Sequence, residues 1–168
     1  MDMRNQPERT FRVDLRHLDG YRFESRASED GRPHGDPFAS DEPDPIGAAS
    51  APATPALLGA AVGHCLAASL LESLRHAHVA VSDCTTEVTA TVRPNAAGLP
   101  RIDHVDVVLK PVVHGDSART QRCQEVFERH CTVTASVRAG IDVRVAVDWT
   151  VVEQEPVRVE AAAAHGTE

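Results

Sequence analysis

The segment from Thr54 to His76 constrains the fold most, because its pattern predicts a long helix with one buried side. Thr54 is a favourable N-cap, and Pro55 stands at the first helical position, where a missing N–H costs little. Apolar or small residues recur at helical spacing: Leu58, Ala61, Val62, Cys65, Ser69 and Leu70. Cys65 is therefore expected on or beside the buried face of this helix rather than in open solvent.

The first half of this helix is rich in small residues. Gly59, Ala60, Ala61 and Gly63 lie within a few positions of one another. Such small side chains allow another backbone to come close, although glycine lowers helix propensity. We therefore expect a second helix to cross at this place.

Alternation of apolar and polar residues predicts strands before and after the helix. Phe11, Val13 and Leu15 alternate with charged residues, and a second alternating run follows Asp19-Gly20, a pair typical of a hairpin turn. The same alternation predicts strands over 84–93 and 102–113, and a last strand over 141–153. Residues 27–53 are rich in Gly, Pro, Asp and Ser, which predicts a long loop or a meandering extra strand.

A second helical region follows the strand over 102–113. It is predicted to start near residue 116 or 117, to run to Phe127, and to weaken over 131–134, where β-branched residues cluster. A short helical turn over 135–138 then ends at Gly140, a favourable C-cap. This order of strands and helices predicts one α+β domain with antiparallel sheets over 11–153. We expect disordered ends over 1–10 and over the Ala-rich residues 154–168.

The overall charge and hydropathy argue against two classes of partner. The net charge is −8, whereas phosphate binding needs clustered Lys and Arg. No apolar run approaches the roughly 20 residues of a membrane span, and the amino terminus lacks the layout of a signal peptide. We therefore expect a cytoplasmic protein that binds neither nucleic acid nor membrane. Aromatic residues make up only 4%, so the core has to be built from Val, Leu and Ala.

The four cysteines do not predict a disulfide scaffold, because the cytoplasm keeps structural thiols reduced. Catalysis, metal binding and simple burial remain as interpretations. Cys84 opens a strand and Cys123 lies within a helix, and neither has a companion motif. We expect burial without a chemical role for both of them.

A metal site is the alternative that the histidines raise. His64 precedes Cys65 and His130 precedes Cys131, which gives the ligand count of a Cys₂His₂ zinc site if the two pairs meet. Adjacent helical residues point about 100° apart, however, and adjacent Cys and His lack the usual ligand spacing. We therefore expect no metal, and an imidazolium that helps one thiolate to form.

Two segments together resemble the osmotically inducible protein C and organic hydroperoxide resistance (OsmC/Ohr) family. They are Leu57 to Cys65, with the sequence LLGAAVGHC, and Cys131 to Gly140, with the sequence CTVTASVRAG. Each motif alone is common, so the resemblance, which covers about 11–152, rests on the pair. It implies an OsmC-like α+β fold in which antiparallel β-sheets pack around two central helices of an intertwined homodimer, with two active sites at the subunit interface.

The resemblance implies a thiol-dependent peroxidase that reduces organic hydroperoxides. Cys65 matches the peroxidatic cysteine and Cys131 the resolving cysteine. The thiolate attacks the peroxide O–O bond, becomes a sulfenic acid, and condenses with the second thiol to a disulfide. An external dithiol, a lipoyl protein by resemblance, then reduces that disulfide, and no bound cofactor or metal is expected. Four apolar residues favour alkyl or lipid hydroperoxides: Leu58, Val62, Leu66 and Phe127.

The sequence departs from the family where an acid is expected. Members of the family usually carry Glu in the first turn of the helix with the peroxidatic cysteine, where it orients a catalytic Arg, but this chain has Pro55-Ala56. Arg16 is the nearest candidate for the Arg, and Glu42 for the acid. In the family the Arg lies near the first hairpin turn, where this chain has Leu18 directly before Asp19-Gly20. Arg22 and Arg26 are alternatives to Arg16. Two further functions therefore stay open, a small-molecule-binding module and a redox sensor with little peroxidase activity.

Overall fold

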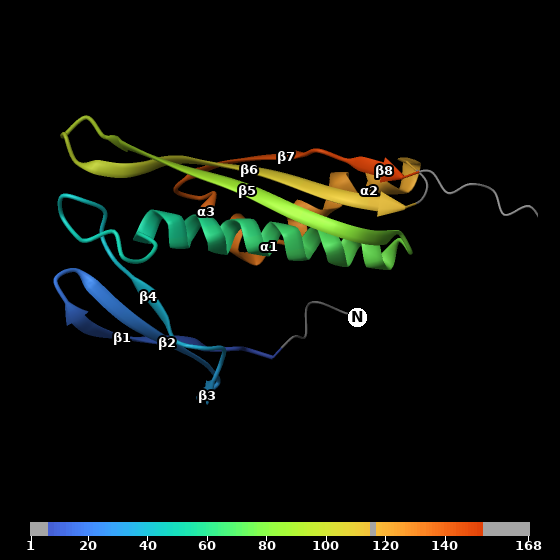
Figure 1. Ribbon diagram of the computed structural model, residues 1–168. Coiled ribbons are helices and arrows are strands. Elements are labelled where there is room, and N and C mark those ends of the chain that lie inside the picture. Colours follow the sequence, from blue (N-terminus) through green and yellow to red (C-terminus); the bar gives the residue numbers. More distant parts are fainter. Residues whose placement is uncertain (1–6, 115–116, 153–168) are drawn as a thin grey trace, which may run out of the picture. The chain divides into compact units, whose positions relative to one another are not determined.

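A computed structural model describes residues 7–114 and 117–152 of the chain (Figure 1). The elements follow in the order β1 (Phe11–Asp19), β2 (Arg22–Glu29), β3 (Arg32–Pro33), β4 (Phe38–Ser40), α1 (Thr54–His76), β5 (Ala80–Pro94), β6 (Pro100–His114), α2 (Ser117–Val126), the 3₁₀ helix η2 (Phe127–His130), α3 (Thr132–Val137), β7 (Asp142–Val147) and β8 (Thr150–Val152). This mixture of helices and antiparallel sheet is the α+β class predicted from the sequence. The ends predicted to be disordered lie outside the described residues over 1–6 and 154–168.

The contacts within the chain define two units. The first consists of the residues up to Val62 together with Val88–Val105, and the second consists of Gly63–Glu87 and the residues from Asp106 onward. Each unit is described below by itself.

The first unit contains the predicted hairpin. Strands β1 and β2 pair in antiparallel, with Leu15 opposite Ser25 and His17 opposite Phe23, and Gly20 takes the left-handed conformation in the turn (φ 49°). The alternation of Phe11, Val13 and Leu15 with charged residues therefore marks the two faces of the sheet, as predicted. Arg9 pairs with Glu29, which ties the residues just before β1 to the end of β2.

The stretch over 27–53 contains more strand than loop at its start. β2 continues to Glu29, and the short strands β3 and β4 both pair with β2 in antiparallel. A structured loop follows, in which the buried carboxylate of Asp41 accepts hydrogen bonds from the backbone N–H and the hydroxyl of Ser50 at 3.0 and 2.8 Å. A Cβ at Gly47 would collide with the carbonyl oxygen of Glu42 and come within 2.7 Å of Asp41 Oδ1. This loop is therefore built around one carboxylate.

The small residues of α1 meet a strand at Gly59. A Cβ on Gly59 would lie 3.2 Å from Cγ1 of Val88, which belongs to β5. Glycine at this position thus permits the close approach of α1 and β5 within the first unit. At Gly59 the approaching element is β5, because a small residue allows any backbone to approach, and the expected crossing by a second helix stays a prediction.

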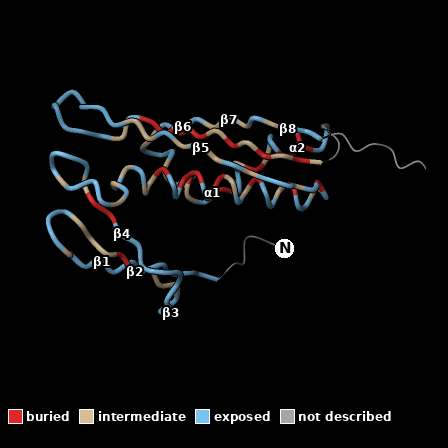
Figure 2. The backbone as a smooth tube through the Cα atoms, in the orientation of Figure 1, coloured by how far each residue is buried: buried red, intermediate tan, exposed pale blue. Residues whose placement is uncertain are grey.

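The core of the second unit is made of leucine and valine, as the scarcity of aromatic residues predicts. Leu66, Leu70 and Leu74 follow one another every four residues along α1 and are fully buried. Three residues at alternate positions of β6 are also buried: Val107, Leu109 and Val113. Figure 2 shows these buried stretches in red along α1 and β6. Phe127 of η2 is the aromatic residue in this core.

The pairing of β8 with β6 is parallel, where the sequence predicted antiparallel sheets throughout. β8 lies beside β6 with Val112 opposite Thr150 and His114 opposite Val152. Parallel neighbours need a long crossover connection, and α2, η2 and α3 provide it between β6 and the last strands. The last strand is also divided, because β7 ends at Val147 and β8 begins at Thr150.

By length and composition, α1 is long and apolar enough to cross a membrane. It has 23 residues, and its most apolar window has a mean hydropathy of 1.5. The expectation that no apolar run approaches the length of a membrane span is therefore wrong by this criterion. A core helix of a soluble protein meets the same criteria, and the buried leucines of α1 serve such a role within the second unit.

Candidate functional site

Cys131 stands at a junction between two short helices of the second unit. It is the N-cap of α3, with an extended backbone (φ −82°, ψ 101°), and its N–H donates to the carbonyl of Glu128 in η2 at 3.2 Å. The sequence predicted a weakened helix at this place because of Thr132, Val133 and Thr134. The structure instead begins α3 at Thr132, and the break in the helix falls at Cys131 itself.

The thiol of Cys131 is enclosed and hydrogen-bonded. Both Cys131 and Thr134 are fully buried, and the S–H of Cys131 donates to Thr134 Oγ1 at 3.0 Å. Cys65, half-buried on α1 in the same unit, lies close enough to Cys131 to raise the pKa of its thiol. The two cysteines singled out by the sequence are therefore brought together, and both are free thiols.

This environment favours the protonated form of Cys131. Burial raises the pKa of Cys131 because a buried thiolate loses its hydration, and the neighbouring thiol of Cys65 raises it further. The hydroxyl and the backbone N–H of Thr134 act in the opposite direction, because both stabilise the thiolate. Cys131 thus keeps its proton at neutral pH and presents an S–H beside Cys65. Two such thiols in contact have the equipment for reversible disulfide formation.

The two expected partners of the thiols, Arg16 and Glu42, lie in the first unit. Arg16 on β1 is an exposed side chain whose Nη2 lies 3.5 Å from Glu24 Oε1. Glu42, in the loop after β4, has a half-buried side chain, and its carbonyl oxygen accepts a hydrogen bond from the N–H of Ala49. Because each unit is described by itself, a catalytic role for Arg16 and Glu42 stays a prediction.

The alternative arginines of the first hairpin also carry carboxylate partners. Arg22 donates from Nη2 to Asp19 at 2.8 Å, and Arg26 donates from Nε to Glu24 at 3.1 Å. The α1 helix has no acidic residue in its first turn, as its sequence indicates. The acid that the family usually carries there therefore has no counterpart on the same helix turn.

The remaining cysteines and the neighbouring histidines are dispersed. Cys123 is buried and donates its S–H to the carbonyl of Ser73 at 3.5 Å, whereas Cys84 is half-buried on β5. Burial raises the pKa of both thiols. His64 and His130 are exposed. Within 7–114 and 117–152, no group of three or more His, Cys, Asp or Glu residues has an arrangement suited to a metal ion.

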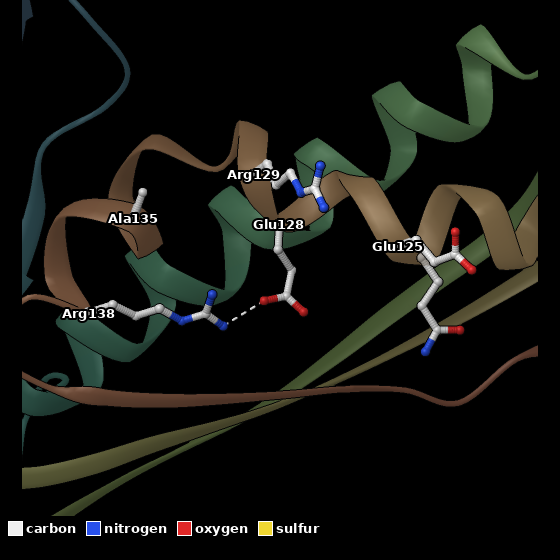
Figure 3. Close-up of a pocket in the computed structure, with 6 residues that line it drawn as sticks. Glu125, Glu128, Arg129, Ala135 and Arg138 are labelled. Carbon is white, nitrogen blue, oxygen red and sulfur yellow. Dashed lines mark hydrogen bonds and ion pairs between the residues drawn. The ribbon is translucent and has the colours of Figure 1, made fainter.

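A shallow depression of about 380 Å³ lies on the surface of the second unit, between the helices that flank Cys131 (Figure 3). Its wall is formed by Gln124, Glu125, Glu128, Arg129, Ala135 and Arg138. Arg138 Nη2 donates to Glu128 Oε2 at 2.6 Å and to the carbonyl of Val143 at 3.2 Å. These contacts join the end of α3 to η2 and β7. We assign this ion pair a structural role, because it holds the two helices that flank Cys131.

Sequence reasoning missed Thr134 as a member of the site. It treated Thr134 only as a β-branched residue that weakens a helix. A usable signal was present, since the side chain of an N-cap residue faces the residue three positions later. With Cys131 as the N-cap, that position is Thr134.

Comparison with known proteins identifies the class to which this fold and thiol pair belong. The sequence profile described as OsmC-like protein matches residues 47–146. The chain therefore belongs to the OsmC-like protein family. A comparison with curated proteins found no match.

Solved structures share this fold at low sequence identity. A hypothetical protein from Aquifex aeolicus VF5 is 15% identical with a TM-score of 0.64, over 87% of this chain and 98% of the other. An OsmC-like protein from Mycoplasma pneumoniae is 13% identical with a TM-score of 0.63, over 90% and 99%. An organic hydroperoxide resistance protein from Elizabethkingia anophelis is 17% identical with a TM-score of 0.59, over 88% and 100%. These similarities establish the OsmC-like fold predicted from the sequence.

Proposed function

We propose that this protein is a thiol-dependent peroxidase that reduces organic hydroperoxides, with Cys65 as the peroxidatic and Cys131 as the resolving cysteine. The observation that carries the proposal is the closeness of these two free thiols within one unit of the chain. A likeness in fold to proteins named for organic hydroperoxide resistance supports the choice of substrate class.

The proposed cycle needs two thiols and one external reductant. The Cys65 thiolate attacks the outer oxygen of the hydroperoxide, the O–O bond breaks, and the alkoxide takes up a proton to leave as an alcohol. Cys131 then attacks the sulfur of the Cys65 sulfenic acid, and water leaves as the disulfide forms. An external dithiol, for which a lipoyl protein is the candidate, returns both cysteines to thiols. No bound cofactor or metal takes part.

The apolar residues near Cys65 and Cys131 in the sequence support the choice of substrate class. Leu66 and Phe127 are fully buried, so apolar side chains lie in the unit that contains both thiols. Val62, which is fully buried, and Leu58, which is half-buried, belong to the first unit. Alkyl and lipid hydroperoxides gain from such surroundings, whereas hydrogen peroxide does not. We propose Arg16 and Glu42 as the arginine and acid that assist the thiolate.

We propose that the protein works as a cytoplasmic homodimer. The support is an apolar face on the first hairpin: Phe11, Val13 and Leu15 of β1 are 62%, 47% and 62% exposed, and Phe38 of β4 is 43% exposed. Ser25 pairs with both Leu15 and Phe38, so these side chains lie on one face of the sheet. Exposed apolar side chains in such a group favour a protein interface, and we assign this one to a second copy.

A second candidate function follows from the first turn of α1. Because Pro55 and Ala56 stand where the family usually has an acid, the chain lacks one group expected to activate the thiolate. An OsmC-fold redox sensor or small-molecule-binding protein with little turnover fits that loss. A sensor would form the disulfide without sustained consumption of peroxide, and a binding protein would form it slowly or not at all.

Consumption of cumene hydroperoxide under reduced lipoamide tests the proposal. The wild-type protein is expected to turn over, and the Cys65→Ser variant is expected to fall to the background rate. Cys84→Ser is the matched control, because it removes a half-buried thiol on β5 that has no role in the cycle. Equal consumption by the wild-type protein and Cys65→Ser would exclude the peroxidase activity. A single stoichiometric oxidation without turnover would favour the redox sensor.

A further inference from the structure

Cys131 has one side-chain partner that the proposed cycle does not use. Its Sγ lies 3.0 Å from Oγ1 of Thr134, and both residues are fully buried. Because Cys131 is the N-cap of α3, the first turn of that helix brings the hydroxyl of Thr134 back to the sulfur. Water does not reach this contact, so solvent cannot replace the hydroxyl as a partner.

We infer that Thr134 is a positioning residue for the resolving step: its hydroxyl holds the Cys131 sulfur and stabilises it when the thiol loses its proton. This inference rests on the proposed function. A threonine hydroxyl carries one donor and two acceptor sites and rotates freely between them. It therefore accepts the S–H of Cys131 in the thiol form and donates its O–H to the sulfur in the thiolate form.

The electrostatic surroundings of Cys131 agree with this role. Within the described part of the chain, the groups that act on its thiol are Cys65 from α1 and Thr134 from α3. Burial and the contact with Cys65 hold the proton on Cys131, whereas the hydroxyl and N–H of Thr134 lower the pKa of its thiol. Thr134 thus favours the thiolate form of Cys131 although the sulfur is buried.

The resolving step balances without any change in Thr134. The Cys131 thiolate attacks the sulfur of the Cys65 sulfenic acid, the S–S bond forms, and the S–O bond breaks. The leaving hydroxide takes up the proton that Cys131 has lost and departs as water. The Thr134 hydroxyl changes from acceptor to donor at Cys131, and it becomes an acceptor again only when the disulfide has been reduced and Cys131 carries a proton.

A peroxide-free assay isolates this step. When dithiobis(nitrobenzoate) reacts with Cys65, one nitrothiobenzoate leaves and a mixed disulfide remains on Cys65. Attack by Cys131 on the Cys65 sulfur then releases the second nitrothiobenzoate, so the second phase of release reports on Cys131 alone. The protein for this assay carries Cys84→Ser and Cys123→Ala, and mass spectrometry verifies the Cys65–Cys131 disulfide.

Thr134→Val is expected to slow the second phase about threefold at neutral pH and to leave the first phase unchanged. The higher apparent pKa of the variant lowers its thiolate fraction by more than the greater nucleophilicity of a more basic thiolate regains. The deficit therefore shrinks once the pH passes the apparent pKa of the wild-type protein, and it reverses at the pH where both proteins are largely ionised. Thr134→Ser keeps the hydroxyl, and its pH profile is expected to follow that of the wild-type side chain.

A structural effect gives a different pattern, because a misplaced sulfur slows the second phase by the same factor at every pH. That pattern, or an unchanged profile for Thr134→Val, would overturn the inference. Thr134→Ser and Thr134→Ala form a second matched pair that differs only in the hydroxyl, for use if the valine variant does not fold.

The assay also separates this inference from the proposed function. No second phase in the parent protein would remove both the Cys65–Cys131 pair and the role of Thr134. If the parent protein turns over peroxide but the second phase of Thr134→Val has the pH profile of the wild-type side chain, the role of Thr134 alone is overturned. If the rate deficit of Thr134→Val reverses at high pH in a protein without peroxide turnover, the role of Thr134 in thiol exchange is supported and the peroxidase is excluded.

Discussion

The cysteine junction and the first hairpin differ in how far their side chains are buried within a single chain. Cys131 and Thr134 are fully buried, and the contact with Cys65 is made inside one unit. On the hairpin, by contrast, Phe11 and Leu15 remain exposed although their pattern is that of a buried sheet face. We propose that the thiol pair forms within each chain, whereas the apolar face of the hairpin contacts a second copy.

Removal of one leucine side chain from each region gives the largest expected contrast. Leu70→Ala opens a cavity beside fully buried neighbours and should cost about 3 kcal/mol of unfolding free energy. Leu15→Ala should cost far less in dilute protein, because Leu15 is exposed in the single chain. Urea unfolding at several protein concentrations measures both. Equal costs in dilute protein would contradict the contrast between the regions.

A charge on the hairpin face should break the proposed dimer. Leu15→Lys places an ammonium among apolar side chains, and we expect the dimer dissociation constant to rise about a hundredfold. Sedimentation equilibrium measures the change. Arg12→Gln, on the opposite face of β1, is the control and should leave the constant unchanged. A wild-type protein that sediments as a monomer at all concentrations would contradict the proposed dimer.

The pH dependence of the disulfide sharpens the account of the junction. Because burial raises the pKa of Cys131, only a small fraction is thiolate at neutral pH. Release of the second nitrothiobenzoate should therefore increase about tenfold per pH unit until the raised pKa is reached. Stopped-flow absorbance over a pH series checks this slope. A rate already constant at neutral pH would mean that Cys131 is ionised there.

Surface ion pairs should have the smallest effect in either region. Arg75 lowers the pKa of Glu72 to about 2, chiefly through its hydrogen bond. Arg75→Gln should raise that carboxyl pKa toward its ordinary value, which NMR titration measures. The stabilisation linked to Glu72 is present above its unfolded pKa and is lost as the pH falls toward 2. A neutral-pH melting temperature that drops sharply in Arg75→Gln would contradict this view, because both groups are exposed.

Local patterns in the sequence predicted the elements well. Alternation from Phe11 to Leu15 and the Asp19-Gly20 turn gave the hairpin, and Thr54-Pro55 gave the start of α1. These signals depend on neighbours in the chain, and such signals are visible in a sequence. The thiol pair came from two motifs and a family resemblance rather than from local physics.

The features that escaped prediction depend on contacts between distant residues. The approach of Val88 to Gly59 and the parallel pairing of β8 with β6 are tertiary choices that no local pattern encodes. At Cys131, β-branched residues lower helix propensity, yet α3 forms there because Thr134 is buried against the thiol. Propensity gave the wrong answer where burial and a cap determine the structure.

Disulfide mapping after a single exposure to peroxide tests the proposed redox pair most directly. The reduced protein receives one equivalent of cumene hydroperoxide, is alkylated, and is digested for mass spectrometry. The account predicts rapid loss of two hydrogen atoms per chain and one new peptide pair that joins Cys65 to Cys131 within the same chain. Oxidation of Cys65 to a sulfinic acid while Cys131 stays alkylated would contradict it, because the two thiols would then not react with each other.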